Sequence, residues 1–320
     1  MDSLIRQIVD AHTAIRPQVR VTPLELSAPL SLINGCEIFL KCEHIQRTGS
    51  FKFRGAVNKI RLLNDSERKS GVITASTGNH GQALALAARS SGVPVTVYAP
   101  ATAAKVKLEA MRTFGARVEL VEGDALAAEK AAAEQAAEQG KLFVSPYNDI
   151  DIIAGQGTVG AELYDRAPDL DAVFVSVGGG GLISGVGSIM KKLSPKTQII
   201  GCWPENATAM YSSLQAGKII DVPERDTLSD GTAGGVEPGS VTFPLCQRVI
   251  DRCELVSEQE IRRAMRLLAS TDRWMIEGAA GVALAAALRL TPEFKGRKIA
   301  VVLCGRNIVL EKYLQAIAEQ

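Results

Sequence analysis

The chain has few aromatic residues, almost no excess charge and no long apolar run. Phe, Trp and Tyr make up 5% of its 320 residues, and they are nowhere interleaved with Arg or Lys as on single-stranded nucleic-acid surfaces. The 36 Lys and Arg residues nearly balance the 35 Asp and Glu residues, which gives a net charge of +1. This balance argues against a surface for binding polyanions. We therefore expect no nucleic-acid partner.

Signals for membranes, secretion and structural metals are also missing. No segment reaches the roughly 18 consecutive apolar residues that a membrane-spanning helix needs. The start, from Met1 to Leu4, lacks the basic and apolar regions of a secretory signal. The six cysteines form no CxxC pair and have no histidine at zinc-like spacing. We expect a cytoplasmic protein with reduced thiols and no membrane contact.

Short apolar runs alternate with helical segments along nearly the whole chain. The helical segments include 80–90, 104–114 and the Ala- and Glu-rich stretch 125–138, which we expect at the surface. Several apolar runs lack polar alternation, as parallel strands do when helices cover both faces of their sheet. The pattern predicts a doubly wound α/β fold that binds ligands at the carboxyl ends of its strands. The expected strands are 37–42, 71–76, 95–99, 117–121, 142–145, 172–177, 198–202, 253–256 and 298–304.

Four consecutive glycines follow the apolar run 172–177. Gly178, Gly179, Gly180 and Gly181 precede Leu182 and a helical pattern. Without side chains, the backbone N–H groups of such a turn can point at an anion held at the helix N-terminus. The glycines could also serve only for close packing. Because the spacing is neither GxGxxG nor that of a P-loop, the turn indicates a phosphate but not a dinucleotide or ATP.

One lysine stands between two phenylalanines, after a small polar stretch. Lys52 lies between Phe51 and Phe53. A lysine that attacks a carbonyl group must be neutral, and burial favours the neutral form by lowering the pKa. The two aromatic rings could supply that burial. The alternative is a surface lysine at the start of a helix.

A second polar loop lies between an expected strand and an expected helix. It contains Ser76, Thr77, Gly78, Asn79 and His80. Hydroxyl and amide groups at a helix N-terminus can bind a carboxylate or a phenolate. Equally, Ser76 or Thr77 could simply cap the helix.

Together these segments resemble the fold-type II, pyridoxal-phosphate-dependent threonine dehydratase and serine racemase family. Five motifs occur in the family's order: SFKFRG at 50–55, STGNHG at 76–81, AGQGT at 154–158, GGGG at 178–181 and VLCGRN at 302–307. The resemblance implies a two-domain α/β fold like that of tryptophan synthase β, with parallel-type sheets covered by helices. Residues 1–70 and 149–320 would form the large cofactor-binding domain, and 71–148 the small domain. Relatives commonly form homodimers, so we expect one here.

The resemblance also implies a cofactor site. Lys52 would carry pyridoxal 5'-phosphate as a Schiff base, and the four glycines with Leu182 would hold its phosphate. Asn79 would donate to the phenolic oxygen. The remaining cofactor contacts would be Phe51, Gly231, Glu277 near the ring, and Cys304 against the pyridine nitrogen.

For the substrate, the resemblance assigns Ser76, Thr77, Asn79 and His80 to binding an amino-acid carboxylate. Lys52 and Thr77 are the expected catalytic residues, and Lys52 would remove the Cα proton. Thr232 or Tyr147 could touch the substrate side chain.

The implied reaction is β-elimination from a β-hydroxy amino acid such as serine, threonine or 3-hydroxyaspartate, giving a 2-oxo acid and ammonia. A neutral thiol beside the pyridine nitrogen makes the ring a weaker electron sink, which suits elimination. An amino-acid racemase is the close alternative, and a β-replacement transferase is the third. From a different class, the glycine turn and the α/β pattern leave a nucleotide-dependent oxidoreductase open.

The sequence departs from the family at several positions. Thr77 stands where racemases have a serine, and its extra methyl group restricts the side chain and disfavours racemisation. Trp203 and Ala209 stand where many relatives have acidic ligands for Mg²⁺ or Ca²⁺, so we expect no divalent metal site unless Glu205 substitutes as a ligand through a shifted turn. Because the sequence ends at Gln320, we expect no regulatory domain and no feedback control by isoleucine.

Overall fold

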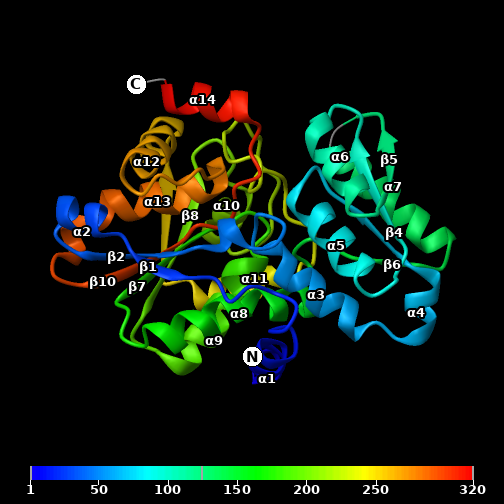
Figure 1. The fold of residues 1–320 in the computed structure, drawn as a ribbon, viewed down its shortest axis with the longest axis horizontal. Coiled ribbons are helices and arrows are strands. Elements are labelled where there is room, and N and C mark those ends of the chain that lie inside the picture. The colour runs from blue at the N-terminus through cyan, green and yellow to red at the C-terminus, as the bar shows by residue number, and fades with distance from the viewer. Residues whose placement is uncertain (1, 124, 319–320) are drawn as a thin grey trace.

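Two β-sheets covered by helices make up the computed structural model, which describes residues 2–123 and 125–318 (Figure 1). The larger sheet has six strands. All neighbouring pairs in it are parallel except β1 and β2, which are antiparallel. Its order is β1 (Leu24–Leu26), β2 (Glu37–Lys41), β10 (Lys298–Val302), β7 (Ala172–Ser176), β8 (Gln198–Pro204) and β9 (Arg252–Val256).

The smaller sheet has four strands, and all its neighbouring pairs are parallel. All four strands lie between residues 71 and 148, and the division of the chain into two domains at these positions stays a prediction. Their order is β5 (Arg117–Val121), β4 (Val95–Pro100), β3 (Val72–Ala75) and β6 (Leu142–Phe143).

Helices cover both faces of the larger sheet. Figure 1 shows α8 and α9 on one side and α12 and α13 on the other. They are α8 (Ile150–Arg166), α9 (Gly181–Leu193), α12 (Glu258–Thr271) and α13 (Gly278–Leu290), with α1 (Asp2–Ala14), α2 (Ala28–Asn34), α10 (Ala209–Ala216), α11 (Thr242–Val249) and α14 (Leu310–Ala318) at the periphery. Strand β7 is buried along its whole length, as the missing polar alternation predicted.

Around the smaller sheet lie α5 (Asn79–Arg89), α6 (Lys105–Thr113) and α7 (Ala125–Glu138). Helix α3 (Lys52–Leu62) packs against both α5 and α8 and so joins the two halves, and α4 (Asp65–Ser70) follows it. Two short 3₁₀ segments complete the structure, at Glu43–Ile45 and Thr291–Phe294. Within the described residues, none of the helices combines the length and the apolar character needed to cross a membrane.

The predicted strands are confirmed to within two residues at each end. Strand β1 was not predicted, because three residues are too few for a recognisable apolar run. The predicted parallel arrangement with helices on both faces is also confirmed. The prediction that segment 125–138 is a surface helix is only partly right, because one face of α7 is buried through Ala128, Ala132 and Ala136.

A buried cluster of charges anchors the first turn of α3. The Arg54 side chain is 0% exposed, and its guanidinium donates from Nε to Glu43 Oε2 at 2.7 Å and from Nη1 to Glu162 Oε1 at 2.7 Å. Glu43 lies in a 3₁₀ segment and Glu162 in α8, and both are buried. Lys41 at the end of β2 also donates to Glu162. The two cations and two carboxylates balance, so the pairing offsets much of the cost of removing these charges from water.

Replacing the central cation is expected to destabilise the protein severely. In Arg54→Met, both Glu43 and Glu162 lose their main partner while still buried, which we expect to cost about 3–5 kcal/mol of unfolding free energy. Urea unfolding followed by circular dichroism measures this loss. The control is Arg252→Met, which removes ion pairs to Glu254 and Glu293 at the surface. An Arg54→Met protein no less stable than the control would contradict the assignment.

Candidate active site

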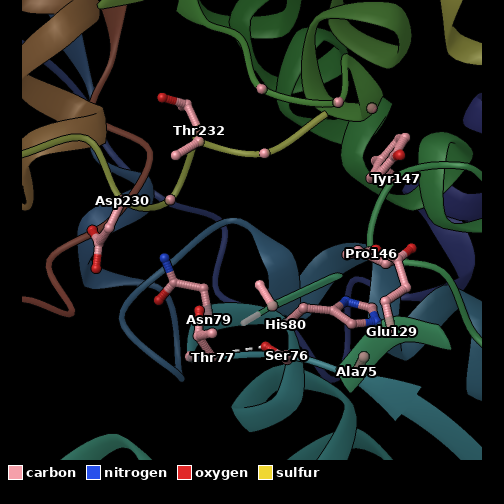
Figure 2. A pocket seen from close by; sticks show the side chains of 18 of the residues that line it. Ala75, Ser76, Thr77, Asn79, His80, Glu129, Pro146, Tyr147, Asp230 and Thr232 are labelled. Atoms are coloured by element: carbon pink, nitrogen blue, oxygen red, sulfur yellow. Dashed lines mark hydrogen bonds between the residues drawn. The ribbon is translucent and has the colours of Figure 1, made fainter. Parts of the chain in front are cut away.

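One cavity of about 680 Å³ lies where the carboxyl ends of β3, β7 and β10 meet (Figure 2). The structure brings every predicted site residue to its wall, although these residues come from six separate segments of the chain. They are Phe51, Lys52, Ser76, Thr77, Asn79, His80, Gly178, Gly179, Gly180, Gly181, Leu182, Gly231, Glu277 and Cys304. Tyr147 and Thr232 also line it.

Lys52 is the first residue of α3, and its amine points into the cavity wall. Its Nζ donates to the Pro146 carbonyl oxygen at 2.7 Å and lies 5.3 Å from the centroid of the Phe51 ring. Burial lowers the pKa of Lys52 to about 8, although Cys304 and Glu277 oppose that shift. Near pH 8 the neutral amine and the ammonium ion therefore coexist. The alternative that Lys52 is an ordinary surface lysine is wrong.

The glycine turn at 178–181 is both closely packed and open to the cavity. Gly180 has φ +86°, and a Cβ atom there would lie 2.7 Å from Cys246 Sγ. A Cβ atom on Gly179 would collide with the Tyr147 ring. Close packing thus excludes side chains at Gly179 and Gly180, as the close-packing interpretation of the turn predicts. The turn also precedes the N-terminus of α9, where unpaired N–H groups favour an anion.

The polar loop before α5 does not use its hydroxyl groups as helix caps. The N-cap residue is Gly78, and no side chain makes a capping hydrogen bond. Ser76 Oγ accepts a hydrogen bond from the Gly78 N–H at 3.1 Å, and Thr77 is exposed at the cavity. The capping alternative for Ser76 and Thr77 is therefore wrong. Figure 2 shows Ser76, Thr77 and Asn79 gathered at one side of the cavity.

A network of two amides and one carboxylate joins distant parts of the cavity wall. Asn79 Nδ2 donates to Glu277 Oε1 at 2.8 Å and to Oε2 at 3.1 Å. The Asn307 backbone N–H donates to Glu277 Oε2 at 2.9 Å, and Asn307 Nδ2 donates to Asn79 Oδ1. Burial raises the pKa of Glu277 to about 7, while the hydrogen bond from Asn79 lowers it. Sequence reasoning assigned no role to Asn307, although the motif at 302–307 includes it.

Two further groups in the wall are held neutral by burial. Burial raises the pKa of the Cys304 thiol well above its ordinary value, so the thiol stays protonated at neutral pH. Burial, together with the charge of Lys52, lowers the pKa of His80 to about 3. The His80 ring lies with Nε2 3.3 Å from the Val144 carbonyl oxygen. His80 can therefore supply a hydrogen bond in the cavity but not a positive charge.

The acidic residues of the wall that sequence reasoning missed include Glu129 and Glu237. Glu129 lies on α7, whose alanines and glutamates are typical of a solvated helix, and Glu237 lies in an irregular loop. No signal in either segment indicates a place in the cavity.

The segment around Trp203 and Ala209, where we expect no divalent metal site, is packed with apolar groups. Trp203 is buried, with its ring centroid 5.7 Å from that of Tyr211, and Ala209 is buried at the start of α10. In the part of the chain that the structure describes, no three His, Cys, Asp or Glu side chains are grouped as metal ligands would be. That this protein needs no metal stays a prediction.

Comparisons with known proteins agree with this site. The family model "Pyridoxal-phosphate dependent enzyme" matches residues 15–305. The L-threonine ammonia-lyase of Thermotoga maritima is 42% identical over 305 residues, which cover 95% of this chain and 75% of that protein. The β-hydroxyaspartate dehydratase of Paracoccus denitrificans is 37% identical over 302 residues, covering 94% and 95%.

A solved structure of maize serine racemase aligns with a TM-score of 0.90 and 32% identity, covering 98% of this chain and 96% of that one. The family match spans the lysine, the glycine turn and Cys304 alike. The chain therefore belongs to the family of pyridoxal-phosphate-dependent enzymes and has their fold-type II architecture.

Proposed function

We propose that this protein deaminates a β-hydroxy amino acid of the serine, threonine or 3-hydroxyaspartate type to a 2-oxo acid and ammonia. The observation that carries the proposal is a partly buried lysine of lowered pKa that shares one cavity with a glycine turn and a hydroxyl-rich loop. The similarity to an L-threonine ammonia-lyase and to a β-hydroxyaspartate dehydratase supports it. A nucleotide-dependent oxidoreductase is set aside, because the family model is that of pyridoxal-phosphate enzymes.

The residues of the cavity fit pyridoxal phosphate. Lys52 supplies a primary amine that is partly neutral near pH 8 and would hold the cofactor covalently as a Schiff base. The glycine turn, Leu182 and the N-terminus of α9 would hold the phosphate. Phe51, Gly231 and the network of Asn79 and Glu277 would enclose the ring. A cavity of about 680 Å³ is of the usual size for a small-molecule site.

The protonated Cys304 thiol would provide a neutral partner for the ring nitrogen. When bound, the cofactor withdraws electrons from the substrate Cα and so makes its proton acidic. A thiol kept neutral by burial does not force protonation of the ring nitrogen as a carboxylate would. The protein thereby favours a reaction in which the departing β-hydroxyl group takes up the electrons.

The chain's own groups would then position the substrate and move its proton. Ser76, Thr77, Asn79 and the neutral His80 surround the N-terminus of α5, where the helix dipole favours the substrate carboxylate. Lys52, freed when the substrate binds, would take the Cα proton, since burial leaves much of its amine neutral. The β-hydroxyl leaves as water, and hydrolysis of the enamine product returns a water and releases ammonia.

Racemisation is the alternative reaction, and the observation that favours it is the position of Thr77. Thr77 places a hydroxyl group at the cavity, and one solved neighbour is a serine racemase. The methyl group of Thr77 restricts the reach of this hydroxyl compared with serine. We therefore expect elimination to dominate.

The quaternary structure and the compartment are further parts of the proposal. We expect a homodimer, on the resemblance to the family, and a cytoplasmic location. The six cysteines are all unpaired, which is consistent with a reducing compartment.

Turnover of L-serine distinguishes the two activities. We expect pyruvate and ammonia in equal amounts and much less D-serine than pyruvate, because Thr77 relays protons poorly. Coupled pyruvate assay and chiral chromatography of the remaining serine measure both products. D-serine formed faster than pyruvate would favour the racemase.

The glycine turn allows a test of the cofactor contacts. In Gly180→Ala, the backbone at φ +86° is strained and the new methyl group meets Cys246. We expect the affinity for pyridoxal phosphate to fall about tenfold or more. The control is Gly235→Ala, where a Cβ atom meets nothing within 4 Å. Titration of the apoenzyme with the cofactor measures both affinities, and equal values would contradict the assignment.

A further inference from the structure

Two carboxyl groups in the cavity have no part in the proposed reaction. Glu129 comes from α7, and Glu237 comes from the loop between α10 and α11. Figure 2 shows the Glu129 side chain near Pro146, and the charge of Glu129 contributes to the raised pKa of Tyr147. The Pro146 carbonyl oxygen is the group that accepts a hydrogen bond from Lys52 Nζ. The two carboxyl groups therefore border the part of the cavity that contains the reactive amine.

Neutral groups, not cations, hold these carboxyl groups in place. Glu237 Oε2 accepts a hydrogen bond from Asn148 Nδ2 at 2.6 Å, and Oε1 accepts one from Ser145 Oγ at 3.5 Å. Burial, a hydrogen bond with Glu237 and the charge of Glu237 raise the pKa of Glu129 to about 7. Two carboxyl groups that share a proton still carry one negative charge, and they carry two when both ionise.

The other charged groups of the cavity wall do not offset this negative charge. The acids are Glu129, Asp221, Asp230, Glu237 and Glu277, and the cations are Lys52, Lys107 and Lys130. Lys107 is paired with Asp230 at 2.8 Å, and Lys52 would be occupied by the cofactor. Only Lys130, an exposed residue next to Glu129 in sequence, remains among the described cations, and no arginine contributes to the described wall.

We propose that Glu129 and Glu237 determine the substrate class by excluding amino acids with a second carboxylate. The substrate is then a β-hydroxy amino acid with an uncharged side chain, of the serine or threonine type, and not 3-hydroxyaspartate. A distal carboxylate would meet like charge in a partly desolvated site, which is strongly unfavourable. This inference rests on the proposed function and narrows it. It also separates this protein from its relative named β-hydroxyaspartate dehydratase.

The test compares kcat/KM for L-threo-3-hydroxyaspartate with kcat/KM for L-threonine. We expect wild-type holoenzyme to favour threonine by about tenfold or more, since one unfavourable charge contact is worth at least that factor. The double variant Glu129→Gln/Glu237→Gln keeps the side-chain shapes and removes the negative charge of the pair whether one or both carboxyl groups are ionised. It is expected to raise the ratio of hydroxyaspartate to threonine by about tenfold, mainly through KM.

Two further variants serve as controls. Glu134→Gln removes an exposed carboxylate from the same helix, outside the cavity wall, and is expected to leave the ratio unchanged. Lys130→Gln tests whether this lysine binds the distal carboxylate instead. If Lys130→Gln abolishes hydroxyaspartate turnover while threonine turnover persists, the proposal is overturned.

A binding measurement keeps this test independent of the elimination reaction. L-aspartate and L-2-aminobutyrate lack the β-hydroxyl group and cannot lose water, and their binding changes the visible absorption of the bound cofactor. We expect 2-aminobutyrate to bind at least about tenfold more tightly than aspartate, and Glu129→Gln/Glu237→Gln to reduce that difference in affinity. Equal affinities in the wild type, or a ratio in Glu129→Gln/Glu237→Gln equal to that in Glu134→Gln, would overturn the proposal. Failure to form a 2-oxo acid from threonine or serine would instead overturn the proposed function alone.

Discussion

The buried charge cluster around Arg54 is the constraint on which the active site depends. Arg54 lies two residues after Lys52, and its guanidinium donates to Glu43 and Glu162 from two other segments. Any shift of α3 along its axis would separate buried charges from their partners, at a cost of several kcal/mol. The cluster thus fixes the start of α3 against β2 and α8. Because Lys52 is the first residue of α3, its backbone is held in place as well, and its side chain extends from a fixed position into the cavity.

The parallel arrangement of the strands explains why the other groups of the active site lie in the same cavity as Lys52. The hydroxyl-rich loop follows β3, the glycine turn follows β7 and Cys304 follows β10, so each lies at the carboxyl end of a strand. Helices α5 and α9 begin directly after two of these loops and direct their N-termini at the cavity. Anion-binding groups and a partly buried amine of lowered pKa are the features that a phosphate-bearing aldehyde cofactor requires. In the same architecture, α7 and the loop that contains Glu237 are the elements that we propose to contact the substrate side chain.

Local patterns predicted most of the fold and much of the site. Apolar runs marked nine of the ten strands, and short motifs in a fixed order identified residues that the structure brings to one cavity. Contacts between distant side chains could not be predicted this way. Asn79 and Glu277 are 198 positions apart, and nothing near either one indicates the other as its partner. Glu129 was missed for a related reason, since only the packing of α7 shows that one of its glutamates faces a cavity.

The central claim is that Lys52 is the amine that carries the cofactor, and its chemical labelling tests that claim most directly. The visible absorption spectrum of the purified protein would be recorded before and after borohydride reduction, and the reduced adduct would be mapped by peptide mass spectrometry. We expect a yellow absorption band that reduction abolishes, with the label on Lys52. A colourless protein that remains unlabelled after incubation with pyridoxal phosphate, or a label on another lysine, would contradict the account.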